Sequence, residues 1–293
     1  MNPPALTAPH SAGSGAPRTA APAQAVDCHH HIFDPRFQKP HEPQVPPATV
    51  GDYRQFLRRL GLARSVFVAS SNYGDDNSCL LDALARFGTD QCRGVAIAHA
   101  DTPDAVLDDL HRHGVRGLRV YLAKGRVPTQ GELRTLGRRA AERGWSINVV
   151  GNRQREVLLD WEAVLAELAC PLVIDHLGWA PQPAGTRSAT AALIRRLLAG
   201  GNAWIKLSGP YLSSAEGPPH FSDVDELAAE LAALAPERTL WGSDWPHPVA
   251  QQHGFVPDGA LLFDQLARWV PDAGRRRQVL VDNPQRLYWA DAA

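Results

Sequence analysis

The segment Val26-Asp27-Cys28-His29-His30-His31-Ile32-Phe33 has the composition of a buried β-strand that ends in three imidazoles. Successive side chains of a strand alternate between its two faces, so His29 and His31 point the same way and His30 points behind them. Two imidazoles that converge on one side of a buried strand can bind a divalent metal, or can position a water molecule and a carbonyl oxygen. The alternative is a chance histidine cluster on an exposed strand or tail. Residues elsewhere in the chain are needed to distinguish a functional histidine pair from such a cluster.

Short apolar segments alternate with segments of helical period from residue 26 to the end of the chain. The strand candidates, bounded by Gly, Pro, Asn or Asp, are residues 26–33, 65–70, 93–98, 115–122, 146–151, 171–178, 203–212 and 239–245. The helix candidates are residues 50–60, 78–87, 103–113, 131–143, 153–169, 186–198, 223–235 and 258–270. Eight strand–helix units in series predict an α/β fold of the (β/α)8 TIM barrel type. A doubly wound sheet is the competitor, but it usually has fewer strands, and no GxGxxG motif follows the first strand.

The chain divides into a short N-terminal segment and one large domain. Residues 1–25 are rich in Pro, Ala, Gly and Ser and lack the continuous apolar stretch of a secretory signal. Such a composition buries too little surface to order itself, so we predict a flexible tail over residues 1–25. Residues 26–293 are then a single barrel domain, long enough to bury a substantial core.

Charge and cysteine content exclude several classes of protein. The chain of 293 residues has 30 Lys and Arg against 31 Asp and Glu, so neither nucleic acid nor an anionic membrane surface is an expected partner. No apolar run approaches the length of a membrane span. The four cysteines show no CxxC spacing and lie in or beside apolar segments. This is typical of reduced core residues in a cytoplasmic protein and argues against a zinc–thiolate site.

Reactive residues gather where the predicted strands end, which is where TIM barrels carry their active sites. In the order of strands one, six and eight, these residues are His29 and His31, Asp175 and His176, and Asp244. Taken alone, His176 could be a hydrogen-bonded core residue and Asp244 the cap of a turn. Asp175 is expected to be structural, because alternation points it away from His176. Three strand ends that each offer His or Asp nevertheless indicate one active site.

Six motifs follow one another from residue 26 to the end of the chain. They are Asp-Cys-His-His-His at 27–31, Gly-Val-Arg-Gly-Leu-Arg at 114–119, Asp-His-Leu-Gly at 175–178, Lys-Leu-Ser-Gly at 206–209, Leu-Trp-Gly-Ser-Asp-Trp-Pro-His-Pro at 240–248 and Asp-Asn-Pro-Gln-Arg-Leu-Tyr at 282–288. In these motifs the chain resembles the amidohydrolase superfamily. The similar branch comprises the lactone enzymes related to 2-pyrone-4,6-dicarboxylate lactonase, 4-sulfomuconolactone hydrolase and D-galactarolactone isomerase.

The resemblance implies an enzyme that hydrolyses an anionic lactone derived from a carboxylate, a sulfonate or a sugar acid. It places four residues at the polar centre of the active site: His29, His31, His176 and Asp244. Asp244 would be the general base that takes a proton from water and then gives it to the leaving alcohol oxygen. The histidines would bind a metal ion or hydrogen-bond the lactone carbonyl, and both roles meet the need for positive character near the developing oxyanion.

The same three imidazoles and the carboxylate of Asp244 could bind one Zn²⁺ or Mn²⁺ and leave a position for water. Relatives with and without metal share these residue types, so the sequence leaves both states open. A second metal is not expected. Binuclear relatives use a Lys or Glu at strand four and a His at strand five, where this chain has Arg119, Tyr121 and Asn148.

Further candidates for substrate binding lie at or beyond the strand ends. They are Asn72, Tyr73, Asn77, Arg119, Tyr121, Lys124, Arg126, Asn148, Tyr211 and His247. A guanidinium grips carboxylates and sulfonates through paired hydrogen bonds, which favours Arg119 as the anion site; a salt bridge within the barrel is the alternative. Asn77 could equally be a helix cap. Trp179 and Gly125 stand where the pyrone-dicarboxylate enzyme has arginines, which favours a smaller or monoanionic lactone, or a hydroxyl-rich sugar-acid lactone.

Three other functions remain open from the sequence. Lactone isomerisation would use a ring hydroxyl in place of water, with Asp244 again as the base. Decarboxylation would demand a tightly bound metal. A non-catalytic binding protein would not need acid and base groups at a strand mouth, where they are costly to keep. We expect a small-molecule anionic lactone as the partner, a cytoplasmic location and a small homo-oligomer.

Overall fold

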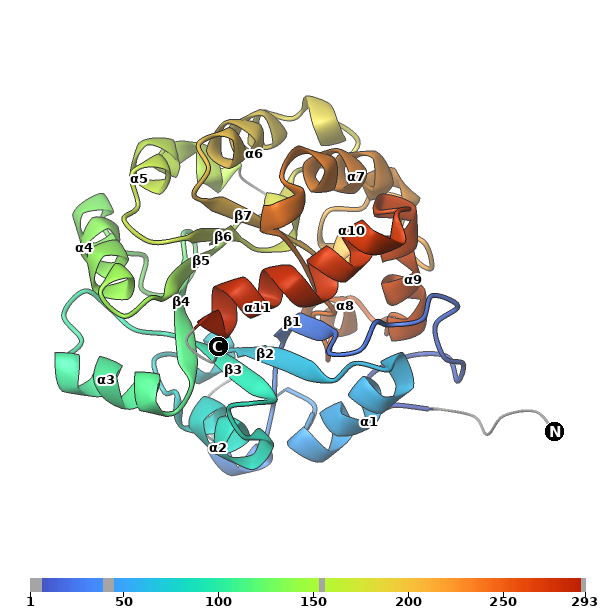
Figure 1. The fold of residues 1–293 in the computed structure, drawn as a ribbon, viewed down its shortest axis with the longest axis horizontal. Coiled ribbons are helices and arrows are strands. Elements are labelled where there is room, and N and C mark those ends of the chain that lie inside the picture. The colour runs from blue at the N-terminus through green and yellow to red at the C-terminus, as the bar shows by residue number, and fades with distance from the viewer. Residues whose placement is uncertain (1–6, 39–44, 153–155, 291–293) are drawn as a thin grey trace.

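Eight parallel strands form the centre of the protein (Figure 1). The computed structural model describes residues 7–38, 45–152 and 156–290. The strands are β1 (Val26–His30), β2 (Arg64–Val68), β3 (Cys92–Ala96), β4 (Val115–Tyr121), β5 (Ser146–Val150), β6 (Leu172–Ile174), β7 (Ala203–Ser208) and β8 (Thr239–Gly242). Each strand pairs in parallel with the next one in the sequence. With helices outside this sheet, the predicted (β/α)8 barrel is confirmed.

The first and last strands are joined where β8 ends. The amide of Asp244 donates a hydrogen bond to the carbonyl of His29 at 2.8 Å. The buried carboxylate of Asp27, on β1, also links the two strands: it accepts hydrogen bonds from the amide of Ser243 at 2.9 Å and from the Ser243 hydroxyl at 2.5 Å. The end of β1 and the segment that carries Asp244 therefore lie side by side.

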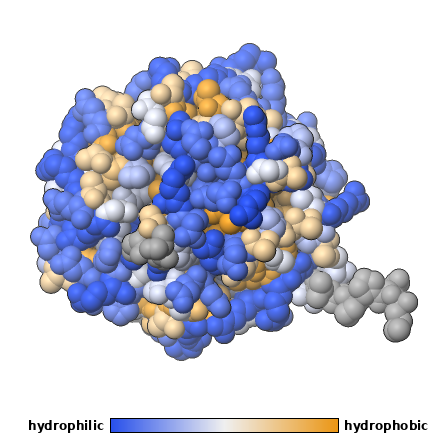
Figure 2. All heavy atoms as spheres, viewed as in Figure 1, coloured by the Kyte–Doolittle hydropathy of each residue, from blue (hydrophilic) through white to orange (hydrophobic). Residues whose placement is uncertain are grey.

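Helices cover the outside of the barrel. They are α1 (Val50–Leu60), α2 (Ser78–Phe87), α3 (Asp104–Arg112), α4 (Gln130–Ala141), α5 (Glu162–Ala166), α6 (Ala189–Ala199), α7 (Asp225–Leu234), α8 (Pro248–Gln252), α9 (Gly259–Trp269), α10 (Ala273–Arg277) and α11 (Asn283–Tyr288). α1 and α2 have the predicted bounds. The face shown in Figure 2 is mainly hydrophilic with apolar residues scattered over it, as expected of amphipathic helices that turn their apolar sides inward.

The short helices α8, α10 and α11 are not among the predicted ones, and residues 153–169 form a different structure from the predicted helix. The helix expected over residues 153–169 is a 3₁₀ turn at Val157–Trp161 followed by the short α5, and residues 153–155 lie outside the described residues. Apolar spacing is similar in both arrangements, so the pattern does not distinguish them. The unpredicted α11 lies over the centre of the barrel in Figure 1, and its Tyr288 packs in one buried cluster with Cys28 and Val66. α11 thereby closes the end of the barrel opposite the strand mouths.

β6 and β8 end earlier than predicted. The sequence predicts strands to residues 178 and 245, whereas β6 ends at Ile174 and β8 at Gly242. His176 and Asp244 adopt positive φ angles of 54° and 59°. A strand cannot continue through this left-handed backbone conformation. Each segment therefore turns at the residue that carries the reactive side chain.

The N-terminal segment contacts the barrel over its described part. The sequence predicts a flexible tail over residues 1–25, whereas residues 7–25 hydrogen-bond to α1 and α9. The guanidinium of Arg59 in α1 donates to the carbonyls of Ala12 and Gly15 at 2.7 and 2.9 Å. The amide of Thr19 donates to Asp264 in α9 at 2.8 Å. Composition underestimates this order because backbone groups, which every residue carries, make the contacts.

The cysteines lie in the core, as their apolar surroundings predict. Cys28, Cys79, Cys92 and Cys170 are all buried and unpaired. Within residues 7–38, 45–152 and 156–290, no helix combines the length and the apolar character that crossing a membrane requires.

Candidate active site

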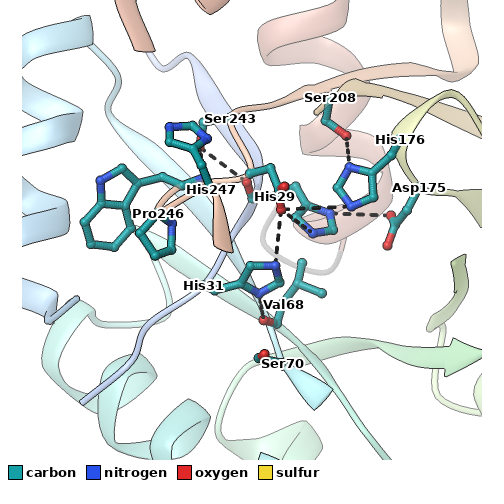
Figure 3. A network of polar contacts seen from close by, with 12 residues as sticks. His29, His31, Val68, Ser70, Asp175, His176, Ser208, Ser243, Pro246 and His247 are labelled. Atoms are coloured by element: carbon teal, nitrogen blue, oxygen red, sulfur yellow. Dashed lines mark hydrogen bonds and ion pairs between the residues drawn. The ribbon is translucent and has the colours of Figure 1, made fainter. Parts of the chain in front are cut away.

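Four side chains from three strand ends meet at the carboxyl-terminal mouth of the barrel, and Figure 3 shows the three imidazoles converging. Oδ1 of Asp244 lies 3.3 Å from Nε2 of His31 and 3.6 Å from Nε2 of His29. The third imidazole, His176, has its Nε2 4.0 Å from the same oxygen. All four side chains are at most 4 % exposed. The structure thus brings together the four residues that the sequence singles out.

The imidazoles are oriented through their other ring nitrogens. Nδ1 of His31 lies 2.7 Å from the carbonyl of Val68, and Nδ1 of His176 lies 2.9 Å from the hydroxyl of Ser208 (Figure 3). A carbonyl only accepts hydrogen bonds, so neutral His31 carries its proton on Nδ1 and presents the Nε2 lone pair to Asp244. Two acceptors that face each other at 3.3 Å need a proton or a metal cation between them.

Charges around the site keep Asp244 ionised. Burial alone would raise the pKa of the Asp244 carboxyl, but the imidazoles of His176, His31 and His29 outweigh burial and hold that pKa well below its usual range. Burial also lowers the pKa of His176, against the opposing charge of Asp244. The site therefore holds an ionised carboxylate at Asp244 among the imidazoles of His29, His31 and His176. This is the state in which a carboxylate can accept a proton.

The second oxygen of Asp244 is held by a tyrosine. Tyr211, in the turn after β7, donates from its hydroxyl to Oδ2 of Asp244 at 2.6 Å. The same hydroxyl lies 3.2 Å from Nδ1 of His247. Burial and the Asp244 charge raise the pKa of Tyr211 well above its usual range, so the phenol remains a donor. The sequence predicts Tyr211 and His247 as substrate-binding residues, and the structure places both against Asp244.

A second polar layer lies deeper in the barrel. Nζ of Lys206, on β7, lies 2.9 Å from Oδ1 of Asp175 and 3.3 Å from Nδ1 of His29. It also donates to Oδ1 of Asn148 at 3.0 Å. The sequence predicts Asn148 as a substrate-binding residue and gives no role to Lys206. A lysine inside an apolar strand is the signal that could have found this layer, because a buried ammonium needs partners.

A cavity of about 130 Å³ lies beside the site, at the ends of β2, β3 and β4. Its lining includes four predicted substrate-binding residues: Arg119, Tyr121, Lys124 and Arg126. The guanidinium of Arg119 lies over the ring of Tyr121 at 4.8 Å. Nε of Arg119 lies 3.7 Å from Oδ2 of Asp175, so this side chain connects the cavity with the deeper polar layer.

Three further residues that the sequence predicts to bind substrate are not among the described residues that line this cavity. They are Asn72, Tyr73 and Asn77. The side chain of Asn77 donates to the carbonyl of Ile97 at 2.8 Å and accepts from its amide at 3.0 Å, so it ties the start of α2 to the chain after β3 and makes no capping bond. The hydroxyl of Tyr73 lies 3.5 Å from the carbonyl of Asp34.

The sequence model of the amidohydrolase family matches residues 26–289. The chain belongs to this family. This amidohydrolase is 34 % identical to a 2-pyrone-4,6-dicarboxylate hydrolase of Comamonas testosteroni, over 94 % of this chain and 93 % of that protein. It is 31 % identical to a D-galactarolactone isomerase of Agrobacterium fabrum, over 93 % of this chain and 94 % of that protein. A solved structure of an Agrobacterium tumefaciens protein is 30 % identical, with a TM-score of 0.83 over 94 % of this chain and 98 % of that one.

Two overlapping groups of buried side chains in this amidohydrolase could hold a metal ion. The outer group is His29, His31 and Asp244, and the inner group is His29, Asp175 and His176. The outer group fits an ion, because Nε2 of His29 has no hydrogen-bond partner among the described residues. Its donors lie 3.3 and 3.6 Å apart, the spacing that donors about 2.0–2.2 Å from one tetrahedral ion would have.

Proposed function

We propose that this amidohydrolase hydrolyses an anionic lactone. The observation that carries the proposal is the ionised Asp244, whose Oδ1 faces three imidazoles at the mouth of the barrel. Lactone hydrolysis needs a base beside the attacking water and positive character beside the carbonyl oxygen, and this arrangement supplies both. The 34 % identity with the Comamonas testosteroni hydrolase supports the same class of reaction.

In the proposed reaction, Asp244 is the general base. Its Oδ1 takes a proton from a water molecule, whose oxygen attacks the carbonyl carbon of the lactone. The imidazoles of His29, His31 and His176 would place positive character beside the developing oxyanion, either as hydrogen-bond donors or as the residues that would hold an ion. The ring C–O bond then breaks and Asp244 returns its proton to the ring oxygen. The product is an open-chain hydroxy acid, which releases one proton at neutral pH.

We also propose that one divalent metal ion, Zn²⁺ or Mn²⁺, binds at the outer group together with His176. Imidazoles and a carboxylate are donors that both ions accept. The facing acceptors of His31 and Asp244, 3.3 Å apart, support this assignment. When bound, the ion supplies a Lewis acid that polarises the lactone carbonyl.

For the substrate, we propose that the anionic group binds to Arg119 in the cavity at the ends of β2–β4. Lys124 lines the same cavity and hydrogen-bonds the hydroxyl of Ser71 at 3.0 Å, so a second cation stands near the guanidinium. Neither Trp179 nor Gly125 can form the paired hydrogen bonds by which an arginine binds a carboxylate, so a planar dicarboxylate would find fewer such contacts here. This favours a smaller or monoanionic lactone, or a sugar-acid lactone rich in hydroxyl groups.

Lactone isomerisation is the second candidate function. The 31 % identity with a D-galactarolactone isomerase favours it. In that reaction a hydroxyl of the substrate attacks the carbonyl in place of water, and Asp244 serves as the same base. Isomerisation consumes no water and releases no proton, which separates it from hydrolysis.

The test is proton release by the purified protein with a panel of anionic lactones, followed by NMR of the products. We expect the wild type to hydrolyse at least one lactone and Asp244→Asn to lose about 10²–10⁴-fold in rate. Asp109→Asn, at an exposed residue of α3, is the matched control and should behave as wild type. An isomerised lactone without proton release identifies the second candidate. Equal rates for Asp244→Asn and wild type would contradict both.

We propose a cytoplasmic location for this enzyme. The four buried, unpaired cysteines support it, because thiols stay reduced in that compartment. Fractionation of cells that produce the protein, with immunodetection in each fraction, tests the assignment.

A further inference from the structure

A buried lysine lies within the inner group of candidate metal ligands. Nζ of Lys206 is 2.9 Å from Oδ1 of Asp175 and 3.3 Å from Nδ1 of His29, so it contacts two of the three residues of that group. Both Lys206 and Asp175 are fully buried. The amide oxygen of Asn148 accepts a further hydrogen bond from the ammonium at 3.0 Å and fixes its position.

The charge of Asp175 is already balanced. Besides Lys206, Nε of Arg119 lies 3.7 Å from Oδ2 of the same carboxylate. A divalent ion at the inner group would stand beside an ammonium with a single carboxylate to balance both, which is unfavourable in a buried site. In the described part of the chain, by contrast, the side-chain partners of Asp244 are three imidazoles and the phenol of Tyr211. A metal cation at the outer group therefore meets no competing ammonium.

We propose that the ammonium of Lys206 takes the place of a second metal ion and limits this amidohydrolase to one ion, bound at the outer group. One imidazole serves both positions, because His29 presents Nδ1 to Asp175 and Nε2 to Asp244. Lys206 is thus a residue that sets metal stoichiometry. The inference rests on the metal site proposed above, but it does not depend on which lactone reacts or whether one does.

The test compares the zinc content of the wild type with that of Lys206→Met, which removes the charge at nearly the same side-chain length. Each protein is equilibrated with Zn²⁺, separated from free ion by gel filtration and analysed by inductively coupled plasma mass spectrometry. We expect Lys206→Met to retain one more Zn²⁺ per chain than the wild type. Lys206→Met combined with Asp175→Asn removes the inner carboxylate as well and should retain no more than the wild type. Lys124→Met, at the cavity, is the matched control for loss of a lysine and should also match it.

Several results would overturn the proposal. Retention of two Zn²⁺ per chain by the wild type would by itself overturn it. Equal zinc content in wild type and Lys206→Met does so too, as does an extra ion that persists without Asp175. Should Lys206→Met fail to fold, Lys206→Gln keeps a donor toward Asp175 without the charge; it should gain the extra ion, and its failure to do so overturns the proposal. Lactone turnover is measured in parallel, so that predicted zinc contents without turnover would refute the proposed function alone.

Discussion

The hydroxyl of Tyr211 fixes how the carboxylate of Asp244 is presented. It donates to Oδ2 at 2.6 Å, which leaves Oδ1 to face His31 at 3.3 Å. The last torsion of an aspartate side chain is broad, so a fixed oxygen restricts it considerably. Tyr211 is not among the described residues that line the cavity beside Arg119. Tyr211 therefore acts on the reaction through Asp244, as a positioning residue.

Replacing Tyr211 with Phe is expected to lower kcat about 10- to 100-fold and to leave KM for the lactone largely unchanged. A hydrogen bond to a charged group is worth about 1.5–3 kcal/mol, and about 1.4 kcal/mol corresponds to a tenfold change in rate. Steady-state kinetics measure both constants. Ser213→Ala removes a hydroxyl from the next residue but one, and this hydroxyl has no hydrogen-bond partner among the described residues, so wild-type kinetics are expected. A raised KM with unchanged kcat in Tyr211→Phe would instead place the phenol on the substrate.

Strand order and side-chain alternation make part of this site predictable. His29 and His31 share a face of β1, and barrel topology brings the ends of strands one, six and eight together. The role of Tyr211 is not predictable in this way. Gly209, at a φ of 54°, turns the chain out of the strand, and alternation no longer says where the following side chains point.

Among the elements, one buried side chain of α1 binds the early part of the N-terminal segment. Nη2 of Arg59 lies 2.7 Å from Oδ1 of Asp258, and its other nitrogens donate to the carbonyls of Ala12 and Gly15. The Arg59 side chain is 1 % exposed. Its loss would leave two backbone carbonyls without their donor and Asp258 without its counter-charge, and breaking a buried ion pair in this way is strongly destabilising.

Arg59→Met is therefore expected to lower the free energy of unfolding by about 3 kcal/mol, measured by urea denaturation. The segment before β1 should also become a site of rapid limited proteolysis, because its attachment to α1 is lost. Arg58→Met, at the exposed neighbouring residue, is the matched control and should change neither property. If Arg59→Met is as stable and as protease-resistant as the wild type, the segment is held by other contacts.

Element bounds are predictable where the sequence encodes the caps. α1 begins after Thr49, whose side chain and that of Asp52 form a capping box, and it ends at Gly61 in the left-handed conformation. These signals stand in the sequence, and the predicted range 50–60 is correct. α5 begins after Trp161, which makes no side-chain capping bond. Without such a signal, apolar spacing alone predicted one long helix where the chain forms a 3₁₀ turn and a short one.

At the scale of the whole molecule, stability depends on histidines that stay neutral in the interior. Burial lowers the pKa of His29 and His30 well below the usual value of 6.5, and lowers that of His247 to about 4. The unfolded chain binds protons at these residues below about pH 6.5, whereas the folded chain does not. The free energy of unfolding therefore falls as pH drops through 6.5, by about 1.4 kcal/mol per pH unit for each such histidine.

Asp27 contributes with the opposite sign. Burial raises its pKa from 3.8 to about 6, against hydrogen bonds from Ser243, His29 and Tyr53. Between these two values the folded chain holds a proton on Asp27 that the unfolded chain has lost. Its contribution to stability is therefore largest at low pH and falls as pH rises toward about 6. Between pH 3.8 and about 6, the effect of Asp27 on the pH dependence of the unfolding free energy cancels that of about one buried histidine. The free energy of unfolding therefore still falls as pH drops, as the remaining histidines dictate.

His30→Phe isolates the contribution of one histidine. The ring of His30 stacks on Tyr53 with centroids 3.7 Å apart, and neither ring nitrogen has a hydrogen-bond partner among the described residues, so a phenyl ring replaces it without loss of a bond. We expect the slope of unfolding free energy against pH to fall by about 1.4 kcal/mol per unit between about pH 5 and 6.5. The variant should then be the more stable protein near pH 5. Urea denaturation at a series of pH values, with a chelator present to keep metal off the neighbouring histidines, measures both slopes. Parallel slopes for variant and wild type would mean that folded His30 binds its proton as the unfolded residue does, and burial in the stack with Tyr53 would then not govern its charge.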